Sequence, residues 1–316
     1  MKKILRTGLT VAFALGLFGC GNAGQDTSDG NADTDSLSVV TTFYPMYEFT
    51  QQVAGEAADV SMLIPSGTDS HGFEPSAKDV AQISEADVFV YSSPEMETWV
   101  TDILNVIESE DVVVVEASEA IELLENETEH DHEHAHGEEG HTHAVDPHVW
   151  LDPIYAQQQV EAIRDGLIEA DPDNQTLYTE QAAHFNSELD TLHQDFTQAF
   201  EGAENRVFVT QHAAFGYLAN RYGLIQESIG GYSTETEPDP ARLAGISSFI
   251  RENNLPVVYY NQSESSAIAE TVAEETGIET AQLHSIEGVS DVEQADGATY
   301  LTLMRQNLEV LKLSIR

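Results

Sequence analysis

The chain has few basic residues and almost no cysteine. Only 12 Lys and Arg stand against 56 Asp and Glu in 316 residues, so the formal net charge is −44 at pH 7. Such a surface repels nucleic acid, and we expect no nucleic-acid partner. The single cysteine, Cys20, excludes a disulfide within the chain.

The N-terminal region has no apolar run long enough to cross a bilayer. Its run from Gly8 to Phe18 follows three basic residues and is shorter than the roughly 20 residues that a membrane helix needs, which is typical of a signal peptide. Leu17-Phe18-Gly19-Cys20 resembles the lipobox of bacterial lipoproteins. We therefore predict a lipoprotein signal peptide over 1–19 and a lipid on Cys20. An uncleaved anchor or a buried free thiol is the alternative.

These features predict an exported protein. Its lipid would hold it at the outer face of the cytoplasmic membrane, or in the periplasm of a host with two membranes. Residues 20–36 are polar and predict a flexible tether.

After the tether, short runs rich in Val and Ile alternate with helical stretches, and the pattern occurs twice. This alternation predicts an α/β fold of two similar lobes, 37–173 and 202–316, each a parallel sheet flanked by helices. The predicted strands are 37–43, 59–64, 87–91, 111–116, 206–210, 225–229, 256–261 and 279–283. The predicted helices within the lobes include 76–86, 96–107, 215–222, 240–253, 265–276 and 299–313.

Residues 174–201 have no proline or glycine, and their apolar positions recur at helical spacing. They predict one long, stiff helix of about 42 Å that joins the lobes. A ligand site is then expected in the cleft between the lobes. His184 and His193 on this helix are nine positions apart and do not share a face, so we interpret them as structural or solvated.

Six of the twelve histidines lie in a polar loop predicted over 128–144. Imidazole suits zinc, copper and nickel, and histidine tracts are typical of metal-collecting segments. The alternative is an inert solvated linker. The candidate auxiliary metal ligands are His130, His132, His134, His136, His141 and His143.

Three further histidines occur singly after predicted strands. His71 follows the strand that ends at residue 64, His148 lies between two prolines, and His212 follows the strand at 206–210. In open α/β sheets, ligands bind beyond the carboxyl ends of strands. Each histidine alone could be an ordinary core or loop residue, but three in equivalent places indicate one site.

Five segments make the chain resemble the cluster A-I metal-binding lipoproteins of ABC importers, specifically the zinc-binding ZnuA/AdcA type. The segments are TFYPMY at 42–47, HGFEP at 71–75, DPHVWLDP at 146–153, HAAFGY at 212–217 and ETEP at 235–238. The resemblance implies that His71, His148 and His212 bind the metal. The third position is His in zinc members and commonly Glu in manganese members.

The family's fourth ligand is a carboxylate from a late loop, which the resemblance places at Glu287. Ser285 stands where the family tends to have proline, so His284 remains an alternative. Three imidazoles and one carboxylate would close the shell of a zinc ion, which favours carrying the ion over catalysis. Because protonated histidine cannot bind metal, affinity should fall as the pH drops toward 6.

The resemblance therefore implies a monomeric zinc-binding lipoprotein that delivers Zn²⁺ to an ABC permease with a cytoplasmic ATPase, and not an enzyme. One alternative is a manganese or iron carrier of the same fold. Another is a secreted zinc hydrolase with Glu74 as its base, and a third is a surface protein for cell adhesion.

Overall fold

The computed structural model describes residues 36–68, 70–107, 111–124, 145–232, 238–261 and 265–316. The predicted signal peptide, Cys20, the tether up to residue 35 and the six histidines of the tract at 130–143 lie outside the described residues. Within the described part of the chain, every helix is too short or too polar to cross a membrane.

The first half of the chain forms a four-stranded parallel sheet in the order β2-β1-β3-β4. Val39 of the inner strand β1 lies opposite Val60 of β2 and Val88 of β3. The strands are rich in β-branched residues, as expected where a sheet is covered on both faces. Their bounds are β1 Leu37–Thr41, β2 Ala58–Met62, β3 Val88–Tyr91 and β4 Val113–Glu116.

The second half forms another four-stranded parallel sheet in the order β6-β5-β7-β8, so the two sheets share one strand order. All eight strands occur where the sequence predicts them, and the α/β fold of two similar halves is confirmed. Their bounds are β5 Val207–Thr210, β6 Ile225–Ser228, β7 Val257–Tyr260 and β8 Glu279–Gln282.

Helices connect the strands, as parallel pairing requires. In the first half they are α1 Tyr44–Ala54, α2 Ala77–Ser84, α3 Val100–Val106 and α4 Pro153–Ala170, with short 3-10 turns at Gly55–Ala57, Val149–Leu151 (η2) and Pro172–Asn174. In the second half they are α6 Gly216–Tyr222, α7 Pro240–Glu252 and α8 Ala267–Thr276. Two further helices follow the last strand, α9 Asp291–Ala295 and α10 Tyr300–Leu311.

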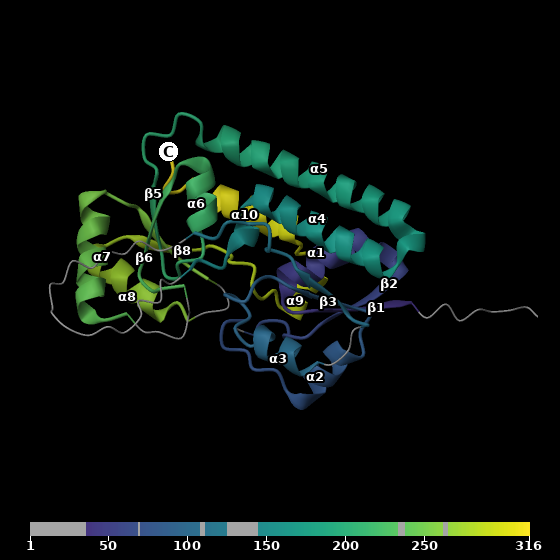
Figure 1. Ribbon diagram of the computed structural model, residues 1–316. Helices are drawn as coiled ribbons and strands as arrows, with labels where there is room; N and C mark the ends of the chain where they lie inside the picture. The colour runs from purple at the N-terminus through teal and green to yellow at the C-terminus, as the bar shows by residue number, and fades with distance from the viewer. Residues whose placement is uncertain (1–35, 69, 108–110, 125–144, 233–237, 262–264) are drawn as a thin grey trace, which may run out of the picture. The chain divides into compact units, whose positions relative to one another are not determined.

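The long helix predicted between the halves is α5, Gln175–Phe200, which spans about 39 Å. It contacts α1 and α4 of the first half and α6 and α10 of the second. Figure 1 shows it running beside α4 and reaching toward α6. Its buried side is Tyr178, Ala182, Phe185, Leu189, Leu192, Phe196 and Phe200.

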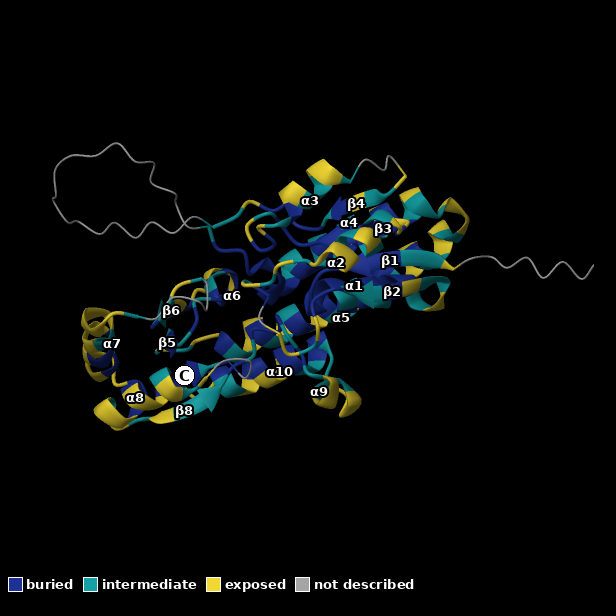
Figure 2. Ribbon diagram, turned by 90° about the horizontal axis from the view of Figure 1, so that it is seen from below, coloured by how far each residue is buried: buried dark blue, intermediate teal, exposed yellow. Residues whose placement is uncertain are grey.

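One hydrophobic core passes through both halves. Successive residues of β1 point to opposite faces, so Val39 enters this core while Val40 packs under α2 and α3. Phe208 and Tyr259 of the second sheet join the same core as Val39, whereas α7 and α8 cover the other face. Figure 2 shows this buried interior, with exposed residues on α7, α8 and α9. The shared core leaves the strand ends of both sheets free to form a site.

Candidate metal centre

Four side chains come together where the two halves meet. His71 lies between β2 and α2, His148 between β4 and η2, His212 between β5 and α6, and Glu287 between β8 and α9. Every one of these loops follows the carboxyl end of a parallel strand, which is where open α/β sheets bind ligands. The three predicted histidines and the predicted carboxylate thus occupy one place.

The ring nitrogens of the three histidines face one another. His148 Nε2 lies 3.2 Å from His71 Nε2 and 3.0 Å from His212 Nε2. Glu287 Oε1 lies 3.3 Å from His148 Nε2 and 3.4 Å from His212 Nε2, and Oε2 lies 3.6 Å from His71 Nε2. The four donor atoms lie within 4.8 Å of one another. One cation at their centre would satisfy all four.

These distances, 3.0–3.6 Å, are close to those of a tetrahedral zinc shell. Zinc binds nitrogen and oxygen at about 2.0–2.2 Å, so neighbouring corners of its tetrahedron are about 3.3–3.6 Å apart. Imidazole and carboxylate are ligands that zinc accepts together. The four side chains are at most 8% exposed. Four buried protein donors leave no position for a reactive water, which suits binding and not hydrolysis.

The site carries opposite charges before any metal arrives. Burial would raise the pKa of Glu287, but hydrogen bonds from His148, His212 and His71 hold it well below its usual range. Burial also opposes protonation of His148, yet its contacts with Asp146 and Glu287 outweigh burial and raise its pKa to about 9. Zinc must therefore displace a proton from His148 at neutral pH.

Asp146 fixes the direction of His148. Its Oδ1 lies 2.8 Å from His148 Nδ1 and accepts a hydrogen bond from the His148 backbone N–H at 3.0 Å. Nδ1 therefore faces the carboxylate and Nε2 faces the site, the usual arrangement behind a metal-binding histidine. Asp146 was not among the residues predicted from the sequence, although an acid two residues before a candidate ligand was a usable signal.

Glu287 reaches the site through an unusual backbone conformation. Ile286 has φ +63°, a left-handed value that a β-branched residue rarely adopts, and its side chain is buried. Neighbouring bonds hold the loop: Trp150 Nε1 donates to the Ser285 carbonyl at 2.8 Å, and Asn261 Nδ2 donates to Ser285 Oγ at 2.7 Å. Ser285 thus has bonding partners of its own where the family tends to have proline.

His284, the alternative to Glu287, lies outside the group of four. Its backbone N–H and carbonyl both bond to the Asn307 side chain at 2.8 Å. Burial lowers the pKa of its imidazole. The structure therefore brings Glu287, and not His284, to the three histidines.

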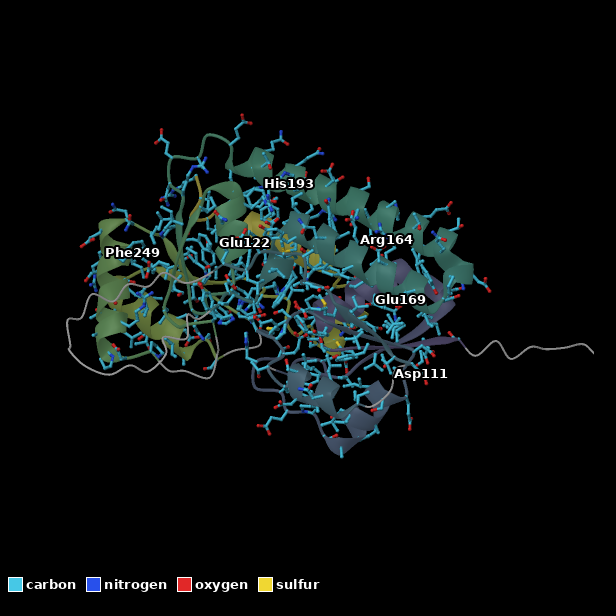
Figure 3. The ribbon with its side chains drawn as sticks, in the orientation of Figure 1. Asp111, Glu122, Arg164, Glu169, His193 and Phe249 are labelled. Atoms are coloured by element: carbon cyan, nitrogen blue, oxygen red, sulfur yellow. The ribbon has the colours of Figure 1, made fainter. Side chains whose placement is uncertain are left out.

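The histidines of α5 are also remote from the group of four. His184 is 73% exposed and lies 4.0 Å from Glu188. His193, labelled in Figure 3, is on α5 with Nδ1 3.2 Å from the Tyr222 hydroxyl. Glu74, the nominal base of a hydrolase, is exposed.

The fold and the four donors define a two-lobed solute-binding protein for a metal ion. The chain belongs to the ZnuA family, described as zinc-uptake complex component A, periplasmic, which matches residues 39–313. The resemblance inferred from the five motifs is confirmed. Since this family consists of binding components of zinc importers, the chain is not an enzyme, and the hydrolase alternative is wrong.

Known relatives agree with this assignment. The chain is 43% identical to the high-affinity zinc uptake system protein ZnuA of Bacillus subtilis, covering 94% of this chain and 92% of the relative. It is 41% identical to the zinc-binding lipoprotein AdcA of Streptococcus pneumoniae R6, over 99% of this chain but only 61% of that protein.

Solved structures share the fold. The Zn(II)-bound ZnuA-like domain of Streptococcus pneumoniae AdcA matches with a TM-score of 0.75 and 39% identity, over 88% of this chain and 98% of that one. The laminin-binding protein Lmb of Streptococcus agalactiae, described as having adhesin and metal-transporting activity, matches with a TM-score of 0.77 and 37% identity, over 88% and 99%.

Proposed function

We propose that the protein captures Zn²⁺ outside the cytoplasm with His71, His148, His212 and Glu287 and passes it to a membrane permease driven by a cytoplasmic ATPase. The observation that carries this function is the spacing of the four donor atoms, 3.0–3.6 Å between the contacting pairs, which fits the corners of a zinc tetrahedron. Relatives named for zinc uptake and zinc binding support the choice of metal.

The proposal includes a surface anchor. A lipid on Cys20, exposed after removal of residues 1–19, would hold the protein at the membrane, and the tether at 20–36 would let the folded body reach the permease. That body comprises lobes 37–173 and 202–316 with the helix 174–201 between them, and acts as a monomer. Radiolabelled fatty acid should be incorporated by the full chain and not by the Cys20→Ala variant.

The histidine tract is proposed as an auxiliary collector. The six histidines at 130–143 would bind zinc more weakly than the preorganised group and raise its local concentration beside His148. Deletion of residues 130–143 should leave one tight zinc per chain. Loss of the tight zinc would instead make the tract the primary ligand set.

The decisive experiment measures zinc content and affinity in the protein that lacks residues 1–20 and 130–143. We expect one tight zinc that manganese does not displace. His148→Ala should abolish tight binding, whereas His184→Ala removes an exposed histidine of α5 and should leave it unchanged. Equal binding in both variants would contradict the proposed site.

Selectivity is tested at His212. His212→Glu replaces a borderline nitrogen donor with a hard oxygen donor, which suits manganese better than zinc. The ratio of zinc affinity to manganese affinity should therefore fall in this variant. An unchanged ratio would exclude His212 from the ligand set.

A further inference from the structure

Two consecutive residues at the start of α6 contact Asp146, the carboxylate behind His148. The Tyr217 hydroxyl donates to the Asp146 backbone carbonyl at 2.7 Å and accepts from the Leu124 N–H at 2.8 Å. The Asp146 N–H in turn donates to the Leu124 carbonyl at 2.9 Å. The backbone of Asp146 is therefore fixed from the second half of the chain as well as from the first.

Gly216, the neighbour of Tyr217, leaves room for the Asp146 side chain. A Cβ at position 216 would overlap Asp146 Oδ2, closer than Cβ contacts occur in real proteins, and would also approach Leu124. Asp146 is completely buried, so its carboxylate is surrounded by protein and does not face solvent. Among the described residues, Asp146 Oδ2 has no hydrogen-bond partner in its present position. A side chain at 216 would therefore displace the Asp146 carboxylate from the position in which its Oδ1 contacts His148 Nδ1.

We propose that Asp146 is the positioning residue that aims His148 Nε2 at the metal, and that Gly216 of the opposite half is the residue that permits it. This inference rests on the proposed zinc site. His212 lies on the loop that leads into Gly216, so the same segment supplies one ligand and positions another. The start of α6 thereby links the two halves through the site itself.

Zinc affinity in a double-mutant cycle tests this link. Replacing the partner behind a metal-binding histidine costs roughly 10–100-fold in affinity, and we expect this loss in Asp146→Ala. Gly216→Ala should lose affinity by a similar factor because it displaces the carboxylate. Once the carboxylate is absent, the added methyl has nothing to displace, so Gly216→Ala in the Asp146→Ala background should change affinity little. If the loss of affinity in the double variant equals the product of the losses in the two single variants, the proposal is overturned.

A matched control separates this effect from a general glycine effect. Gly245 of α7 is exposed, and a Cβ there would meet nothing within 4 Å. Gly245→Ala should bind zinc like the unmodified protein. If Gly216→Ala fails to fold, the zinc affinity of Asp146→Asn tests the positioning role of Asp146 instead. Asparagine retains an oxygen acceptor for the His148 ring and should recover most of the affinity lost in Asp146→Ala, and equal losses in the two variants would overturn the proposal.

A second readout works without metal. Nitrogen-15 NMR of the zinc-free protein, recorded above the pKa of His148, should find the His148 proton on Nδ1 in the unmodified protein and a mixture of tautomers in Asp146→Ala. Identical spectra would overturn the positioning role. Failure of the unmodified protein to bind zinc would overturn the proposed function while leaving this result interpretable.

Discussion

Glu97 is a completely buried carboxylate that takes no part in the metal centre. Its Oε1 accepts from the Thr42 hydroxyl at 2.6 Å and the Ser92 N–H at 3.0 Å, and its Oε2 accepts from the Ser93 N–H at 3.1 Å. Burial disfavours the charged form more than these bonds favour it, so the pKa of Glu97 is raised to about 7. This carboxyl joins the ends of β1 and β3.

Glu97 should therefore make stability depend on pH. Because its pKa is higher in the folded state than in the unfolded state, its contribution is fully present below pH 4.5 and is lost as the pH rises through 7. The free energy of unfolding of the unmodified protein minus that of Glu97→Gln should fall by about 3 kcal/mol between pH 4.5 and 8. Urea denaturation of the zinc-free proteins measures it. Glu95→Gln, an exposed neighbour, is the control, and a constant difference for Glu97→Gln would contradict the prediction.

Zinc affinity should also depend on pH. The raised pKa of His148, about 9, means that zinc must displace a proton throughout the neutral range. Affinity should therefore rise with pH, about tenfold per unit, until the pH reaches about 9. From the sequence, zinc affinity was expected to fall only as the pH drops toward 6; the raised pKa of His148 extends this pH dependence up to about pH 9. Competition with a chelator between pH 6 and 9.5 measures the slope, and constant affinity between pH 7 and 9 would contradict it.

Some residues of the metal centre could be predicted from the sequence, and others could not. His71 and His212 were recognisable because each follows a predicted strand, and His148 because it lies between two prolines. The choice between His284 and Glu287 was not decidable from spacing, because it depends on the left-handed φ of Ile286. Asp146 lies only two residues before His148, which is a local signal. Gly216 approaches Asp146 from a distant loop, which no local pattern predicts.

Among the elements, α5 should be structural and not part of the binding chemistry. Phe196 is completely buried on it and stacks on Tyr222 with ring centroids 5.2 Å apart. Phe196→Ala should lower the free energy of unfolding by about 3–5 kcal/mol because it leaves a cavity. Chemical denaturation measures this loss.

Gln198 is exposed on the same helix, so Gln198→Ala provides the control. It should change the free energy of unfolding by no more than about 0.5 kcal/mol. The folded fraction of Phe196→Ala should still bind one zinc. Loss of the metal from protein that remains folded would show that α5 acts on the site.

Elements with a strong pattern were predicted well. Strands β1, β3, β4, β5 and β7 are rich in β-branched residues, and the long helix lacks both proline and glycine, so period and composition agree. The helices predicted with residue ranges did not include α1, α4 and α9. Helix α1 begins Tyr-Pro after the aromatic Phe43, residues that favour strands or turns, although Pro45 is tolerated in a first turn. Helix α9 has only five residues, too few for a helical period to be visible.

At the scale of the whole molecule, the two halves should unfold together. They share one hydrophobic core, to which Val39, Phe208 and Tyr259 all belong. Both tryptophans, Trp99 and Trp150, belong to the first half, whereas far-ultraviolet circular dichroism reports on both halves. Fluorescence and circular dichroism should therefore give one coincident urea transition.

The same urea denaturation can be repeated in the presence of zinc. Zinc at 1,000 times its dissociation constant should stabilise the folded protein by about 4 kcal/mol and shift both probes equally. Two separate transitions, or a shift in one probe alone, would mean that the halves fold independently.

The position of the four ligands along the chain also determines when zinc can bind relative to folding. His71 follows the second strand of the first sheet, and Glu287 follows the last strand of the second. A partly synthesised or unfolded chain therefore has no such centre, because its donors converge only when both sheets are complete. Zinc can therefore enter this centre only when both sheets come together, so a chain threaded unfolded through a membrane could not bring zinc with it in this centre.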